Sequence, residues 1–188
     1  MISKAYIVHG YLASPQRNWF PWLAGKLMAA GIDTHCIELP SAEQPHFDDW
    51  QQALAETIGT PNEQTLLVAH SLGCISLLHY LSQARPQQIG GLILASGFAE
   101  HLPALPKLNL YIDQTKFGSA AICATTPHIF SLISDNDSIV PPILSKNLAH
   151  KLGSHIHTVA NGGHLLDSDG FTELLPAWQA ARAILATA

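Results

Sequence analysis

Six short runs of aliphatic and β-branched residues alternate with segments of helical periodicity, and this alternation constrains the fold most. Four of the runs are almost continuously apolar, as expected for strands that are covered on both faces. The runs are AYIVHG (5–10), DTHCIEL (33–39), TLLVAH (65–70), GLILAS (91–96), HIFSLIS (128–134) and HIHTVA (155–160).

The segments between and after these runs carry apolar residues at helical spacing, and several of them stop at glycine or proline. They cover residues 19–31, 47–59, 72–86, 141–153 and 171–186. A repeated strand–helix–strand order predicts a parallel sheet with right-handed crossovers. We therefore expect an α/β fold in three layers, with a mostly parallel sheet and helices on both of its faces.

Length and composition narrow the class of protein. The 188 residues suit a single domain over residues 1–188, and 47% apolar with 12% charged residues is a globular composition. A net charge of −5, with nine scattered Lys and Arg residues, argues against nucleic-acid binding. No apolar run approaches the roughly 18 residues of a membrane span. Three cysteines without a C-x-x-C pair, and no leader-like N-terminus, predict a cytoplasmic protein.

Functional groups in a parallel sheet gather at the carboxyl ends of the strands. Five polar clusters follow predicted strands directly, so the fold should bring them to one edge. They are His9-Gly10-Tyr11, Ser71, Ser96-Gly97, residues 135–137 and Gly163-His164.

Ser71 lies in VAHSLGC, between a predicted strand and a predicted helix. This is the context of the nucleophile elbow, whose usual pattern is G-x-S-x-G. Gly73 matches the second glycine, whereas Ala69 replaces the first. Amides at the helix N-terminus would favour an oxyanion beside the serine. Alternatively, Ser71 is an ordinary helix N-cap.

A base and an orienting acid follow Ser71 in the order typical of α/β-hydrolases. His164, in ANGGHLLD, comes directly after the last predicted strand, where flanking glycines free the backbone to aim the ring. SDNDSIVPP offers two acids, Asp135 and Asp137. We select Asp137 as the orienting acid because Pro141 opens the next helix, and Asp135 better suits the turn.

The remaining candidate residues concern the oxyanion hole and the substrate pocket. The amide of Leu72 is the first oxyanion donor, and the amide of Tyr11 is the second, with Leu12 as runner-up. Leu12, Trp19 and Phe20 are candidate pocket residues; packing of the first helix is the alternative for the two aromatic residues.

Several of these motifs together resemble the small serine hydrolases of the retinoblastoma-binding-protein-9 and YdeN type. The motifs are HGYLASPQRNWFPWL, ELPSAEQPHFDDW, VAHSLGC, SDNDSIVP and GGH, and they run along essentially the whole chain. The resemblance implies a compact α/β-hydrolase fold with little or no cap, and it places a catalytic triad on Ser71, Asp137 and His164.

Our hypothesis is a serine hydrolase that cleaves a small carboxylic ester, thioester or amide, without cofactor or metal. Its partner would be a small acyl substrate, and the sequence indicates no protein partner. A protein-interaction module with a vestigial or secondary hydrolase site is the alternative, although no triad member is missing. Acyl transfer and C–C hydrolysis would use the same elbow. Residues 98–118 lack clear periodicity, and whether they form a flap stays open.

Overall fold

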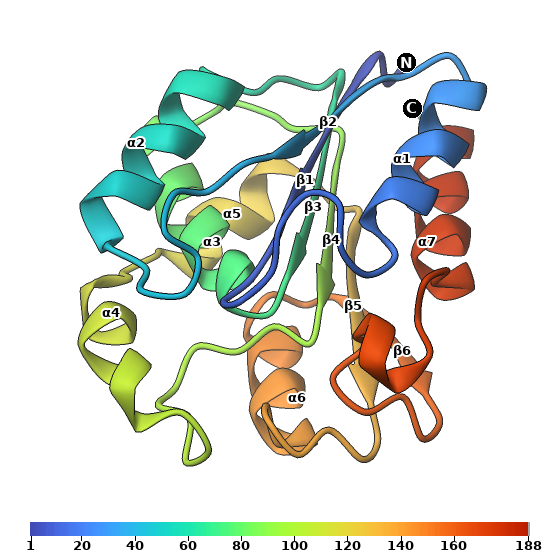
Figure 1. The fold of residues 1–188 in the computed structure, drawn as a ribbon. Helices are drawn as coiled ribbons and strands as arrows, with labels where there is room; N and C mark the ends of the chain where they lie inside the picture. Colours follow the sequence, from blue (N-terminus) through green and yellow to red (C-terminus); the bar gives the residue numbers. More distant parts are fainter. Residues whose placement is uncertain (188) are drawn as a thin grey trace.

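The structure, a computed structural model, describes residues 1–187 and is built on one six-stranded sheet (Figure 1). All neighbouring strands are parallel, in the order β2-β1-β3-β4-β5-β6. The strands are β1 (Lys4–Val8), β2 (Asp33–Ile37), β3 (Thr65–His70), β4 (Gly91–Ala95), β5 (Ile129–Ser134) and β6 (His155–Val159). Five strands lie within runs that the sequence predicted as strands, and β1 begins one residue before its run, so the parallel α/β prediction is confirmed.

Helices cover both faces of this sheet, which confirms the three-layer prediction. They are α1 (Phe20–Ala29), α2 (Phe47–Ile58), α3 (Leu72–Ala84), α4 (Asn109–Gln114), α5 (Ser119–Thr125), α6 (Pro142–Lys151) and α7 (Leu175–Thr187). The apolar faces of α1 and α7 pack on one side, and helices α2 to α6 lie on the other (Figure 1). Helix α7 begins at Leu175 rather than at residue 171, because Pro176 fits only the first turn of a helix.

Burial falls from the centre of the sheet to its edges. Every residue of β3 and β4 is buried, whereas the first four residues of the edge strand β6 are exposed. The central strands lie between two helical layers, which explains their unbroken apolar sequence. Ser71 therefore emerges from the most enclosed part of the sheet, and His164 follows its open edge.

Residues 98–118 fold into a small element packed beside α2 and α3. They contain a 3₁₀ turn (Pro106–Leu108) followed by α4. Tyr111 of α4 contacts the ring of Trp50, with 5.5 Å between ring centroids, and its hydroxyl lies 2.7 Å from Ser76 Oγ. These contacts anchor the segment to α2 and α3. Within residues 1–187, no helix is both long and apolar enough to cross a membrane.

Candidate active site

Ser71 occupies the sharp turn between β3 and α3. Its backbone has φ 54° and ψ −126°, a conformation that costs a residue other than glycine about 1–3 kcal/mol. Its amide donates to the carbonyl of Ala95 on the neighbouring strand at 2.9 Å. Only 7% of the residue is exposed. A helix N-cap normally has extended backbone and caps an amide with its side chain, and Ser71 does neither. The geometry is that of an elbow.

Close backbone approach explains the glycines around this turn. A Cβ on Gly73 would lie 2.3 Å from the carbonyl oxygen of His9, and a Cβ on Gly10 would lie 2.9 Å from Ser71 Cβ. Neither position has room for a methyl group. Ala69 instead lies in β3 and is fully buried in an apolar cluster, where its methyl group is accommodated. The missing first glycine therefore leaves the turn intact.

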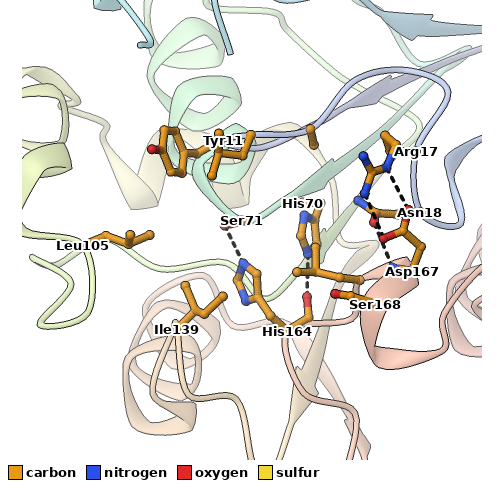
Figure 2. A pocket seen from close by; sticks show the side chains of 13 residues that line it. Tyr11, Arg17, Asn18, His70, Ser71, Leu105, Ile139, His164, Asp167 and Ser168 are labelled. Carbon is orange, nitrogen blue, oxygen red and sulfur yellow. Dashed lines mark hydrogen bonds and ion pairs between the residues drawn. The ribbon is translucent and has the colours of Figure 1, made fainter. Parts of the chain in front are cut away.

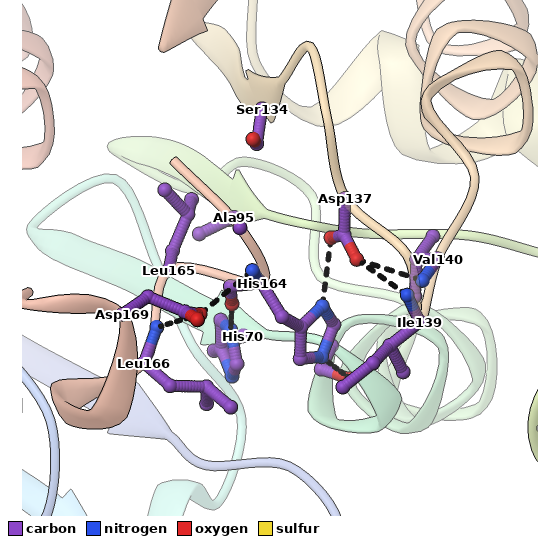
Figure 3. A network of polar contacts seen from close by, with 12 residues as sticks. His70, Ala95, Ser134, Asp137, Ile139, Val140, His164, Leu165, Leu166 and Asp169 are labelled. Atoms are coloured by element: carbon purple, nitrogen blue, oxygen red, sulfur yellow. Dashed lines mark hydrogen bonds and ion pairs between the residues drawn. The ribbon is translucent and has the colours of Figure 1, made fainter. Parts of the chain in front are cut away.

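Ser71, His164 and Asp137 form one continuous chain of hydrogen bonds (Figures 2 and 3). His164 Nε2 lies 2.9 Å from Ser71 Oγ, and His164 Nδ1 lies 2.7 Å from Asp137 Oδ2. Since the carboxylate only accepts, Nδ1 carries the proton and Nε2 accepts from the serine hydroxyl. The structure thus brings together the three residues that the sequence singled out, and it places Asp137 rather than Asp135 beside the imidazole.

The Asp137 carboxylate is held in its ionised form. Burial acts to raise the pKa of Asp137, but hydrogen bonds from His164 and from two backbone amides outweigh burial and lower the pKa below its usual value. Those amides, of Ile139 and Val140, each donate to Oδ1 at 2.9 Å. Oδ2 is thereby left to face the imidazole as a charged acceptor.

Two side chains that directly follow β5 hold the loop that carries His164. Asp135 Oδ1 accepts from the Asn161 amide at 2.7 Å, so Asp135 holds the loop that follows β6. Its neighbour Asn136 accepts from the Gly163 amide at 2.8 Å. The segment 135–137 therefore holds both the loop and, through Asp137, the ring.

Asp169 braces the same loop from its far side. Its Oδ2 accepts from the amides of His164 and Leu166, at 2.8 and 3.2 Å. Gly163 has φ 54°, and a Cβ there would lie 2.5 Å from Asp169 Cγ. Glycine is therefore required at 163 both for its conformation and for space. Sequence reasoning missed Asn136 and Asp169, because neither position carries a motif of its own.

Trp19 and Phe20 do not line the pocket, and this prediction was wrong. Both are fully buried against the sheet in the apolar cluster of α1 and α7. They sit where α1 begins, so the apolar face of that helix turns them inward. The Trp19 indole instead donates to the carbonyl of Leu165 at 3.1 Å. Leu12 does line the pocket and is 63% exposed.

The loop after β1 lies beside the N-terminus of α3. A Cβ on Gly10 would be 3.4 Å from the Leu72 nitrogen. The amides of Tyr11 and Leu72 have no acceptor within residues 1–187, whereas the Leu12 amide donates to Ala42 at 2.9 Å. Leu12 is thus excluded as an oxyanion donor, and Tyr11 and Leu72 keep two free amides beside Ser71.

A pocket of about 270 Å³ opens above Ser71 and His164 (Figure 2). Arg17 and Asp167 form an ion pair in its wall, with Nε to Oδ2 at 2.8 Å. The other lining residues are Tyr11, Leu12, Ala13, Asn18, His70, Leu105, Ile139, Leu166 and Ser168. The pocket is therefore small, largely apolar near the serine and polar at one side.

Comparison with known proteins assigns this arrangement to a family. The family model described as serine hydrolase matches residues 5–186, almost the whole chain. The chain belongs to the serine hydrolase family. This serine hydrolase is 40% identical over 175 residues to YdeN of Bacillus subtilis, named as a hydrolase, covering 93% of this chain and 92% of YdeN. It is 24% identical to serine hydrolase RBBP9 of Rattus norvegicus, over 92% of each chain.

Solved structures agree with this assignment. The crystal structure of the ydeN gene product from B. subtilis superimposes with a TM-score of 0.93 at 37% identity, covering 98% of this serine hydrolase and 99% of that chain. Est1E from Butyrivibrio proteoclasticus matches with a TM-score of 0.73 at 14% identity, over 98% and 88% of the two chains. At that identity, Est1E supports the fold alone. The resemblance seen in the sequence motifs is confirmed.

Proposed function

We propose that this serine hydrolase cleaves small carboxylic esters, or the related thioesters and amides, with Ser71 as nucleophile, His164 as base and Asp137 as orienting acid. The observation that carries the proposal is the unbroken chain Asp137–His164–Ser71 at the base of a pocket, with contacts of 2.7 and 2.9 Å. Such a chain activates an otherwise weakly nucleophilic hydroxyl.

Acylation starts when Ser71 Oγ attacks the carbonyl carbon of the bound ester. His164 Nε2 takes the hydroxyl proton, and Asp137 stabilises the resulting imidazolium through Nδ1–H. The carbonyl oxygen becomes an oxyanion, which the free amides of Leu72 and Tyr11 would bind; one such donor typically contributes about 2.7–4 kcal/mol. Collapse breaks the bond to the alcohol oxygen, which receives the proton from His164.

Deacylation repeats these steps with water. His164 Nε2 takes a proton from a water molecule as its oxygen attacks the acyl carbon on Ser71. The second oxyanion collapses, the Ser71 ester bond breaks, and the proton returns from His164 to the serine oxygen. The products of this step are a carboxylic acid and the regenerated enzyme, and the two steps together consume only the ester and water.

A series of p-nitrophenyl esters with graded acyl length tests the proposal. A pocket of about 270 Å³ favours short acyl chains, so kcat/KM should be highest for these and fall as the chain lengthens. Ser71→Ala should abolish turnover, while Ser3→Ala, at the opposite end of the sheet, should not change it. Full activity in the folded Ser71→Ala variant would contradict the proposal.

A further inference from the structure

His70 is the last residue of β3 and directly precedes Ser71, but its side chain serves a different part of the site. Its Nε2 lies 2.9 Å from the backbone carbonyl oxygen of His164 (Figure 3). Its ring also packs against the His164 ring, with 4.9 Å between centroids. No other side chain of the described residues makes both contacts with His164. One strand end therefore supplies the nucleophile and a direct support for its base.

The hydrogen bond fixes the protonation of His70. A carbonyl oxygen only accepts, so Nε2 must carry the proton and donate it. The other nitrogen, Nδ1, is buried and has no hydrogen-bond partner among residues 1–187. Burial, and to a lesser extent the neighbouring His164, lower the pKa of His70 to about 3. His70 is therefore a neutral donor at neutral pH.

The surroundings of His70 hold its ring in one place. Trp19 and Phe20 of α1 pack around it, at centroid distances of 6.2 and 5.9 Å. These are the two aromatic residues that the sequence suggested for the pocket. Their rings are fully buried and pack beside His70. A donor packed in this way fixes the carbonyl of His164, and with it the point from which the imidazole extends.

We propose that His70 is a positioning residue that holds the His164 imidazole in line between Ser71 and Asp137 through the His164 carbonyl. The inference rests on the proposed function, in which His164 becomes a cation during each step. A neutral donor supports the loop without opposing that cation, whereas a positively charged side chain at this distance would repel it. Misplacement of a reacting group by about 1 Å can cost a factor of about 100 in rate.

Two substitutions separate the hydrogen bond from mere space filling. In His70→Gln, the side-chain amide nitrogen can take the place of Nε2 and remains a neutral donor. In His70→Asn, the amide nitrogen reaches only the place of Nδ1. We expect kcat of His70→Asn to fall by about 10- to 100-fold with KM little changed, and His70→Gln to stay within about threefold of wild type. If His70→Asn does not fold, His70→Met, with the length of Gln but no donor, replaces it.

Trp19→Phe is the matched control for loss of a buried hydrogen bond to this loop. It removes the donor to Leu165, the residue after His164, but leaves the His70 hydrogen bond and keeps an aromatic ring packed beside His70. We expect thermal stability to fall in Trp19→Phe while kcat changes by less than about threefold. Equal kcat in folded His70→Gln and His70→Asn, or an equal loss in Trp19→Phe, would overturn the proposal.

A spectroscopic measurement makes this test independent of turnover. The His164 Nδ1 proton, donated to a carboxylate at 2.7 Å, should give a strongly downfield proton NMR signal, assigned by its disappearance in Asp137→Asn. We expect the signal in wild type and His70→Gln, and its loss or broadening in His70→Asn. An unchanged signal in His70→Asn would refute the positioning role. If wild type hydrolyses no ester, the proposed function fails, and this comparison still decides the role of His70.

Discussion

The elbow around Ser71 and the loop around His164 are built in different ways. Together they place Ser71 Oγ 2.9 Å from His164 Nε2. The elbow joins a buried central strand to a helix, and backbone contacts fix it: the Ser71 amide donates to Ala95, and Gly73 lies against β1. The loop follows an exposed edge strand, and side chains hold it through its amides and carbonyls.

This difference predicts how each region responds to substitution. Removing a side chain near the elbow leaves its backbone contacts in place, whereas adding an atom at Gly73 or Gly10 forces the backbone apart. In the loop, each support is one side chain that can be removed without disturbing the sheet. The nucleophile should therefore be sensitive to added bulk, and the base to lost hydrogen bonds.

The largest effect is expected at the contact that orients the ring. In Asp137→Asn the amide oxygen can still accept from Ile139 and Val140, but a neutral amide no longer holds the Nδ1–H tautomer of His164. We expect kcat for p-nitrophenyl acetate to fall by about 10⁴-fold, with the fold retained by circular dichroism. Asp135→Asn, which keeps an acceptor for Asn161, is the control; a similar loss there would remove the distinction between the two acids.

The elbow is best tested by a single added methyl group. In Gly73→Ala the new Cβ would meet the His9 carbonyl at 2.3 Å, so we expect a loss of about 1–3 kcal/mol in unfolding free energy and at least about 100-fold in kcat/KM. Gly25→Ala, in α1 with no atom within 4 Å of its Cβ, should instead be stabilised by about 0.5–1 kcal/mol. Normal activity in Gly73→Ala would show that the elbow is looser than the structure indicates.

Acid should lower the free energy of unfolding, partly through protonation of His70 in the unfolded chain. Below the ordinary histidine pKa of about 6.5 the unfolded chain binds a proton at this residue, whereas burial keeps the folded pKa near 3. Stability should therefore fall with pH between these values, by up to about 1.4 kcal/mol per pH unit, or about 2 kcal/mol at pH 5. Asp137, whose folded pKa is lowered, adds a further loss only below about pH 4.

Urea unfolding of wild type and His70→Gln at pH 7.5, 6 and 5 isolates this contribution. The glutamine variant cannot take up the proton, so its stability should decline less over the same range. Parallel declines in the two proteins would assign the acid sensitivity to other groups.

The smallest effect is expected at the outer brace of the loop. Asp169→Ala leaves the amides of His164 and Leu166 without their acceptor, but the other hydrogen bonds of the loop stay in place. We expect kcat to fall by about 10-fold and unfolding free energy by about 1 kcal/mol. Asp33→Ala, on the edge strand β2 and remote from the loop, is the comparison for loss of an exposed carboxylate. If kcat fell further in Asp169→Ala than in Asp137→Asn, the Asp169 contact would matter more for turnover than the Asp137 contact, contrary to our proposal.

The sequence predicted the sheet because strands buried on both faces leave unbroken apolar runs. It also predicted which side chains meet, since the ends of parallel strands share one edge. The catalytic roles of Ser71, Asp137 and His164 stay predictions. The hydrogen bonds of His70 and Trp19 were missed because their partners lie 94 and 146 residues away, and the direction of a buried side chain depends on the packed helix. Trp19 and Phe20 were misplaced for the same reason.

Active-site labelling with a fluorophosphonate tests most directly whether elbow and loop act as one unit. We expect wild type to be labelled at Ser71 alone, as located by peptide mass spectrometry. Ser71→Ala should take up no label, and folded His164→Gln should be labelled far more slowly. Three results would contradict a joint role of Ser71 and His164: labelling at another residue, no labelling of folded wild type at neutral pH, or equal labelling rates in wild type and His164→Gln.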